Sequence, residues 1–225
     1  LLVSLTVFAS AAGAATEYQI ASPGQLLLAQ NFDQSSALPE HFHEGAGEWV
    51  IVDHTLRGQQ REKDHHTAFR KIYLDHQDVI YEYDVKIEGD AFSQLLINYD
   101  LVHIAKAMIT ADEFSLYKLS EQTKRDQMIA QQRDQGNDPL HGDWSEKNTV
   151  LDKAAFTIKP GQWVHVVVEM VGDQLAMQIN GHPIRGRHRG ITEKKTNFGF
   201  QAGGLNGFVF FDNIKVWQAM PKPTS

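Results

Sequence analysis

Apolar and polar residues alternate at every second position from residue 48 to residue 218, and this pattern constrains the fold more than any other feature. A period of two gives each β-strand one apolar and one polar face, and turn residues separate the runs. So many short strands with few helical stretches predict an all-β sandwich of two antiparallel sheets, in a single domain over residues 16–220. The predicted strands are Trp49–Arg57, Thr67–Leu74, Val79–Glu88, Phe92–Tyr99, Val102–Ile109, Glu113–Lys118, Trp163–Val171, Gln174–Ile179, Phe198–Ala202 and Phe208–Trp217.

One hairpin has a register that the apolar pattern predicts. A two-residue turn at Gly172-Asp173 places Val168 opposite Met177, so the apolar side chains of both strands share one face. Asn180-Gly181 then predicts a type I′ turn that leads into a further strand.

A second hairpin is predicted between Val79–Glu88 and Phe92–Tyr99. A two-residue turn would set Glu82 opposite Ile97, whereas a three-residue loop sets it opposite Asn98 and matches the apolar faces. We therefore expect Glu82 and Asn98 to share an outward polar face.

Residues 119–150 interrupt the β pattern. Ser120 is a suitable N-cap for a short helix over Glu121–Arg133, and the polar stretch Gly136–Asn148 is rich in turn residues. We interpret this region as a surface excursion between strands, and Pro221–Ser225 as a tail.

The first 15 residues resemble a signal peptide that lacks its basic n-region. Leu1–Phe8 is apolar, Ala9–Ala15 consists of small residues, and Ala12-Gly13-Ala14 fits a cleavage site. We expect cleavage near Ala15 and a secreted or periplasmic protein. A membrane anchor is the alternative, but the apolar stretch is shorter than the roughly 20 residues that a span requires, and we expect no span in the mature chain.

Charge and composition exclude several classes of function. The net charge of −7, with both signs interspersed, argues against a nucleic-acid-binding surface. The absence of cysteine excludes disulfides and cysteine nucleophiles. Nucleophile-elbow, phosphate-loop and dinucleotide motifs are also missing.

Carboxylates follow one face of the strand Val79–Glu88. Glu82, Asp84 and Glu88 lie at i, i+2 and i+6, and paired acids cleave glycosidic bonds. Glucanases of the lichenase and laminarinase type carry E-x-D-x-x-E or E-x-D-x-E on such a strand, but here Lys86 stands inside a wider spacing. We consider Glu82 and Asp84 as general acid or base; the alternative is a solvated polar strand face.

Histidines provide a second group of candidates. The segment Glu62-Lys63-Asp64-His65-His66 leads into a strand, and His66 is a third candidate catalytic group. Its alternative is a loop-edge cluster without a ligand. The candidates for a divalent metal site are His66, His103 and Asp100, and those for substrate binding are Asn98, Arg70 and Trp144.

Trp144 differs from the other tryptophans in its position. It falls in the polar excursion, where its ring is able to stack on a sugar, whereas Trp49, Trp163 and Trp217 fall in strands, where core packing is the simpler role.

Several segments, in the same order along the chain, resemble the 3-keto-disaccharide hydrolase family. Residues 47–58, GEWVIVDHTLRG, are similar to its opening pattern G-x-W-x-V-x-D-G-x-L-x-G, with His54 in place of a frequent glycine. The segments DHHTA, DVIYEYDVK, PGQW, VEMVGD and FDNIKVW also resemble a branch of this family. The resemblance implies a concanavalin A-like jelly roll, secretion and cleavage of glycosidic bonds in oxidised sugars, with a divalent metal as a candidate cofactor.

We therefore expect a carbohydrate-active protein with a carbohydrate ligand or substrate. The leading hypothesis is cleavage of 3-keto-glycosides at an acidic, histidine-rich sheet face. The alternatives are a non-catalytic glycan-binding module, and an interaction module of the laminin-G type with calcium at the sandwich edge.

Overall fold

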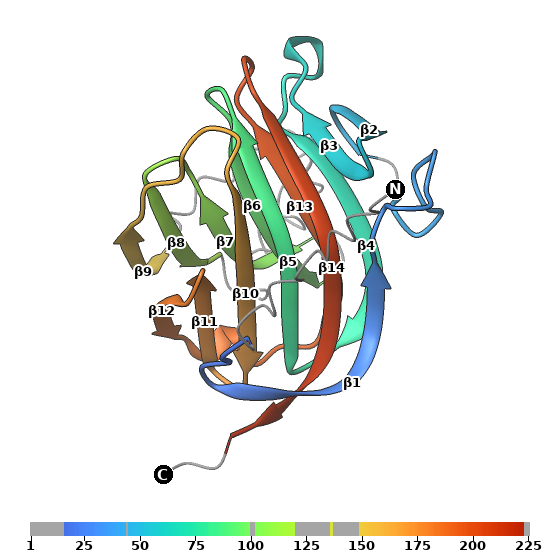
Figure 1. Cartoon of the computed structure of the whole chain (residues 1–225). Coiled ribbons are helices and arrows are strands. Elements are labelled where there is room, and N and C mark those ends of the chain that lie inside the picture. Colours follow the sequence, from blue (N-terminus) through green and yellow to red (C-terminus); the bar gives the residue numbers. More distant parts are fainter. Residues whose placement is uncertain (1–15, 44, 100–101, 120–135, 137–148, 223–225) are drawn as a thin grey trace, which may run out of the picture.

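The chain forms a β-sandwich in the computed structural model, which describes residues 16–43, 45–99, 102–119, 136 and 149–222 (Figure 1). Within these ranges the only helical elements are two 3₁₀ turns, η1 (Glu62–Asp64) and η2 (Arg189–Ile191). The strands are β1 (Ala21–Gln30), β2 (Glu48–Val52), β3 (Thr55–Gln59), β4 (Ala68–His76), β5 (Val79–Glu88), β6 (Phe92–Tyr99), β7 (Val102–Ile109), β8 (Glu113–Lys118), β9 (Thr149–Ala155), β10 (Trp163–Val171), β11 (Gln174–Ile179), β12 (His182–Arg187), β13 (Lys195–Gly203) and β14 (Phe208–Pro221).

The strands form two sheets, and every strand pairing is antiparallel. Sheet A has the order β12-β11-β10-β5-β14-β3-β2, with β1 added along β14. Sheet B has the order β4-β13-β6-β7-β8-β9. Figure 1 shows sheet A nearest the viewer, with sheet B behind it. This architecture confirms the predicted all-β jelly roll.

The core lies between the sheets, where the alternation predicted it. Tyr81, Tyr83 and Val85 of β5 point inward and are fully buried. The ring of Tyr83 packs edge-on against Phe200 of β13, 5.2 Å between centroids, and so joins the two layers. The polar residues of β5 consequently point out of the sandwich.

The first predicted hairpin is confirmed. Val168 pairs with Met177, and Gly172-Asp173 is the two-residue turn between β10 and β11. Asn180 and Gly181 both have positive φ, 47° and 84°, as a type I′ turn requires. Residues close together in the sequence determine this register, because the turn and the two apolar faces together fix it.

The second predicted hairpin is wrong. β5 pairs with β10 and β14 in sheet A, whereas β6 pairs with β13 and β7 in sheet B. The chain crosses from one sheet to the other between these two strands. Glu82 therefore lies opposite Val167 and Lys215, and neither Asn98 nor Ile97 is its partner.

The predicted strand Trp49–Arg57 is two strands. Asp53 and His54 adopt positive φ, 48° and 61°, and fold β2 back on β3. His54 thus takes the left-handed conformation that glycine adopts most easily. Strands β1 and β9 were not predicted.

Several predictions lie at or beyond the limits of the described residues. The signal peptide of residues 1–15 and the helix over residues 121–133 lie outside them. β14 continues through Pro221, which was assigned to the tail. In the described ranges no helix combines the length and the apolar character that crossing a membrane requires.

Candidate functional site

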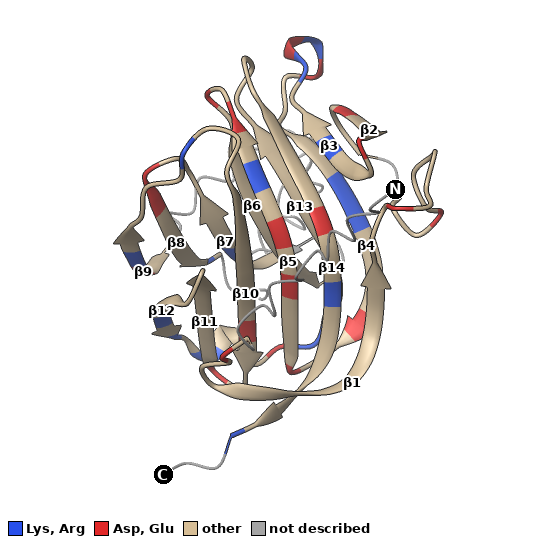
Figure 2. Cartoon of the chain, viewed as in Figure 1, with Lys and Arg blue, Asp and Glu red and all other residues tan. Residues whose placement is uncertain are grey.

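The predicted acids Glu82 and Asp84 lie on the outer face of sheet A, on either side of a histidine. β10 runs beside β5 and places His165 opposite Asp84. The Nδ1 atom of His165 is 2.8 Å from Asp84 Oδ1, and its Nε2 atom is 3.3 Å from Glu82 Oε1. Figure 2 shows acidic residues along β5 and a basic residue on the adjacent β14, on the sheet nearest the viewer.

Charge and burial fix the protonation of this cluster. The His165 hydrogen bond, the nearby Lys215 charge and the Trp217 indole N–H lower the pKa of Glu82 to about 2, against the opposing effect of burial. Hydrogen bonds to Asp84 and Glu82 raise the pKa of His165 to about 9. At neutral pH Glu82 is ionised and His165 is protonated, so Glu82 has no proton to donate as a general acid.

The N-terminal segment of the described chain lies over the same face. Thr16 and Tyr18 donate side-chain hydrogen bonds to Glu82, at 3.3 and 3.2 Å. The backbone N–H groups of residues 19–21 all donate to the buried carboxylate of Glu169, at 2.6 to 2.9 Å. Tyr18 and Ile20 also pack on a small apolar cluster that includes Val167. This arrangement gives Glu82 a structural role, and its catalytic role stays a prediction.

The outer face of sheet B carries a row of side chains across four strands. The ladder aligns Tyr73 of β4 with Asn197 of β13, Asn98 of β6 and His103 of β7. Asn98 Nδ2 donates to Asn197 Oδ1 at 2.8 Å, and Asn98 Oδ1 lies 2.6 Å from His103 Nδ1. Because a carbonyl oxygen only accepts, His103 Nδ1 carries the proton, and the basic lone pair of the neutral ring is on Nε2.

A hollow lies at one end of this row. It has a volume of about 490 Å³ and is lined by Tyr73, Leu74, Asp75, Tyr99 and Thr196. Tyr73 is 59% exposed and Tyr99 is 38% exposed. The two accessible phenol side chains combine flat apolar rings with hydroxyl groups, which suits a polar ring-shaped ligand.

The structure does not bring the predicted site residues into one pocket. Glu82 and Asp84 face outward from sheet A, whereas Asn98 and His103 face outward from sheet B, and the core separates them. His66 follows η1, and its Nδ1 donates to the carbonyl oxygen of the next residue, Thr67, at 2.7 Å.

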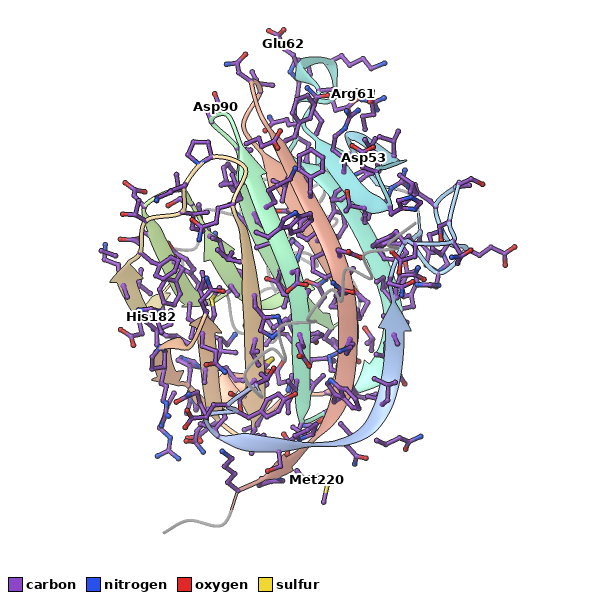
Figure 3. All side chains as sticks on the ribbon, in the orientation of Figure 1. Asp53, Arg61, Glu62, Asp90, His182 and Met220 are labelled. Carbon is purple, nitrogen blue, oxygen red and sulfur yellow. The ribbon has the colours of Figure 1, made fainter. Side chains whose placement is uncertain are left out.

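His66 also lies far from His103 within sheet B. Five residues of β4, about 17 Å of strand, separate the register position nearest His66 (Ala68 with Ala202) from that of the amide row (Tyr73 with Asn197). Figure 3 shows Arg61 and Glu62, which precede His66, at the end of the molecule opposite Met220. Met220 and Asp75 line one hollow, so the end of β4 that carries Tyr73 and Asp75 lies near Met220, away from His66. His66 and His103 therefore cannot share a metal ion.

The remaining predicted residues are placed as follows. Arg70 of β4 donates to the carbonyl of His43, 3.4 Å away, at the sheet edge. Asp100 and Trp144 lie outside the described residues. In the ranges that the structure describes, no three histidine, aspartate or glutamate side chains gather as metal ligands. The two predicted ligands that the structure describes, His66 and His103, lie apart and do not by themselves fit a divalent metal.

Sequence reasoning missed the roles of His165 and Asn197. The backbone of His165 bonds to Asn180 of the neighbouring strand end, with His165 N–H donating to Asn180 Oδ1 and Asn180 N–H donating to His165 O, both at 2.9 Å. The ring, however, reaches across to β5, whose position beside β10 no local pattern reveals. Asn197 precedes the predicted strand Phe198–Ala202. It lies on the sheet because β13 is longer than predicted and begins at Lys195.

Comparison with known proteins assigns the family. Residues 32–217 match the model of the 3-keto-alpha-glucoside-1,2-lyase-like domain. The chain belongs to this family. A search of curated proteins found no match.

Solved structures share the fold at low sequence identity. One is a Bacillus subtilis protein of unknown function with a galectin-like fold (TM-score 0.63, 14% identity, 90% of this chain and 100% of that one). Another is the carbohydrate-binding module CBM66 from Bacillus subtilis (TM-score 0.55, 15% identity, 76% and 91%). A third is SCLam, a non-specific endo-β-1,3(4)-glucanase (TM-score 0.58, 9% identity, 89% and 93%).

Proposed function

We propose that this family member binds a carbohydrate on the outer face of sheet B, over the row Tyr73, Asn197, Asn98 and His103. The observation that carries the proposal is the hydrogen-bond chain from Asn197 through Asn98 to His103, next to the exposed ring of Tyr73. The two amides are buried and bonded within the row, so they hold the half-buried imidazole of His103 in place. The exposed ring of Tyr73 offers an apolar surface to the C–H face of a pyranose.

The names of similar structures support a carbohydrate ligand. They include a carbohydrate-binding module and a glucanase that share this fold. The family model is itself named for a lyase that acts on a 3-keto-glucoside.

Isothermal titration calorimetry with a panel of oligosaccharides tests the proposal. Tyr73→Ala should weaken binding by about tenfold, because an aromatic contact of this kind is worth roughly 1.5 kcal/mol. Trp163→Ala is the matched control, since Trp163 is an exposed aromatic residue on the opposite sheet, 39% accessible. Equal losses in the two variants, or binding of no oligosaccharide by the wild type, would refute the proposed site.

Cleavage of a 3-keto-glycoside is the second candidate, favoured by the tautomer of His103. The hydrogen bond to Asn98 holds the proton on Nδ1, so Nε2 is the basic atom of the ring. In the proposed step Nε2 takes the proton from C2, which the adjacent C3 carbonyl acidifies. The C2–H electron pair forms an enolate, the C1–O bond then breaks, and the departing oxygen takes up a proton.

This step is distinguishable from catalysis at the predicted acids. Turnover of a 3-keto-disaccharide, followed by NMR of the unsaturated product, should fall about 100-fold or more in His103→Gln. Glu82→Gln and His66→Ala should keep the wild-type activity per folded molecule. If Glu82→Gln or His66→Ala abolishes turnover while His103→Gln does not, the acid row or His66 provides the catalysis.

We propose further that the protein is exported and cleaved near Ala15. The Ala12-Gly13-Ala14 pattern supports this location. Mass spectrometry of the cell envelope and the medium should find a chain that begins near Thr16. A protein retained in the membrane with residues 1–15 attached would contradict the proposal.

A further inference from the structure

Two lysines occupy the proposed carbohydrate-binding face of sheet B. The ladder aligns Lys71 of β4, through Gly199 and Leu96, with Lys106 of β7. This row lies two residues from the amide row along each of β4, β13 and β6, about 7 Å away on the same outward face.

Each lysine rests on an aromatic ring. Lys106 Nζ lies 4.6 Å from the centre of the Tyr117 ring. Lys71 Nζ lies 5.5 Å from the Tyr73 ring and 5.9 Å from the Phe69 ring. The Phe69 ring covers Gly199, since a Cβ atom on Gly199 would come within 2.4 Å of it. The face thus combines flat apolar surface with ammonium groups.

Neither lysine forms a salt bridge among the described residues. In contrast, Lys153 lies 2.9 Å from Glu113 and Lys194 lies 2.5 Å from Asp75, both near the margins of the same sheet. Carboxylates are present elsewhere in abundance, as the net charge of −7 records. Within the part of the chain that the structure describes, the absence of an ion pair at Lys71 and Lys106 therefore distinguishes them from the lysines at the margins of the sheet.

Burial makes an uncompensated charge costly for Lys106. Its side chain is partly buried, and burial lowers its pKa. An ammonium group that loses water without gaining an anion is unfavourable, and a ring face compensates only in part. A bound anion would restore the missing interaction.

We infer that the carbohydrate bound on sheet B is anionic, with acidic groups that pair with Lys106 and Lys71. This inference rests on the proposed carbohydrate-binding function. Three inter-strand spacings, about 14 Å, separate the two lysine positions. Lys106 leans away from β4 over Tyr117 of β8, so one acidic group does not bridge the two ammonium groups as they lie. The ligand is accordingly an acidic oligosaccharide, whose charge comes from uronate carboxylates or from sulfate esters.

Matched ligand pairs test the inference. The probes are oligouronates (galacturonate, glucuronate and alginate series), their carboxyl-reduced neutral counterparts and sulfated oligosaccharides, measured by calorimetry at two salt concentrations. We expect one acidic series to bind at least tenfold more tightly than its neutral counterpart, with affinity that falls as salt rises. The carboxylate and sulfate series show which acidic group is recognised.

Variants connect the preference to the two lysines. Lys106→Gln should weaken binding of the acidic ligand about tenfold and Lys71→Gln about threefold, with little effect on a neutral ligand. Lys159→Gln is the control, because it removes the same charge from an exposed loop residue outside both rows of the sheet, in the connection between β9 and β10. Circular dichroism confirms that each variant is folded.

The outcomes separate this inference from the proposed function. Equal affinity for acidic and neutral ligands, or no effect of Lys106→Gln beyond that of Lys159→Gln, overturns the anionic ligand and leaves carbohydrate binding in place. If no acidic, neutral or sulfated oligosaccharide binds, the proposed function itself fails.

Discussion

Replacement of Glu82 by glutamine should destabilise the fold, because its carboxylate is the acceptor for four groups on the outer face of sheet A. These donors are the side chains of Thr16, Tyr18, His165 and Trp217. Glu82 is 7% exposed, so solvent screens its carboxylate little. A pKa that falls from 4.5 to about 2 corresponds to roughly 3 kcal/mol of preference for the ionised form.

That figure is an upper bound for the variant. The amide that replaces the carboxylate keeps an oxygen for Tyr18 or Trp217, and Asp84 still faces His165. We therefore expect Glu82→Gln to lower the free energy of unfolding by about 2 kcal/mol at pH 7. The raised pKa of His165 reflects the same interaction and is not added to this figure.

The pH dependence has a definite sign. A carboxyl group whose pKa is depressed on folding stabilises the protein above its unfolded pKa, and this stabilisation is lost as the pH falls through the folded pKa. The difference between wild type and Glu82→Gln should thus be complete between about pH 4.5 and 6.5 and should vanish near pH 2. It should shrink again as the pH rises toward 9, because His165 then loses its proton in the wild type. The pKa of His165, about 9 in the wild type, should fall but stay above 6.5 because Asp84 remains.

Urea denaturation from pH 2 to pH 8 and NMR titration of His165 measure both effects. Glu40→Gln is the matched control, since it removes the same charge from an exposed loop residue. Equal unfolding free energies for the two variants at pH 7, or a difference that persists at pH 2, would refute the structural role derived for Glu82.

Three further predictions concern other buried groups. Glu169→Gln should cost about 2 kcal/mol and speed hydrogen exchange at the amides of residues 19–21, which donate to its carboxylate; unchanged exchange would contradict the role of Glu169. Gly199→Ala should cost 1–3 kcal/mol in urea denaturation, because its Cβ would lie 2.4 Å from the Phe69 ring and 2.6 Å from the Arg70 carbonyl oxygen. Burial lowers the pKa of Lys195 from 10.5 to about 8. Between pH 8 and pH 10.5 the unfolded state therefore binds more protons than the folded state, and the free energy of unfolding should rise with pH over that range. Lys195→Met should flatten that rise, and an unchanged slope would show that another group titrates.

Much of the architecture was predictable because its causes are local. The alternation in Val79–Glu88 predicted both a strand and the face that Tyr81, Tyr83 and Val85 bury. Gly172-Asp173 and Asn180-Gly181 fixed their hairpins, since turn geometry and apolar faces lie within a few residues of each other. The Asp53-His54 turn was missed, because neither residue is glycine although both adopt positive φ.

Strand partners, and with them the candidate sites, were decided by tertiary structure. Asp84 and His165 are 81 residues apart in sequence, and Asn98 and Asn197 are 99 apart. A strand with one apolar face can pair with any neighbour that buries the same face, so its sequence does not choose between sheets. The sequence alone established which side chains point outward. Packing of the two sheets then placed Glu82 and Asn98 on opposite surfaces, because β5 belongs to sheet A and β6 belongs to sheet B.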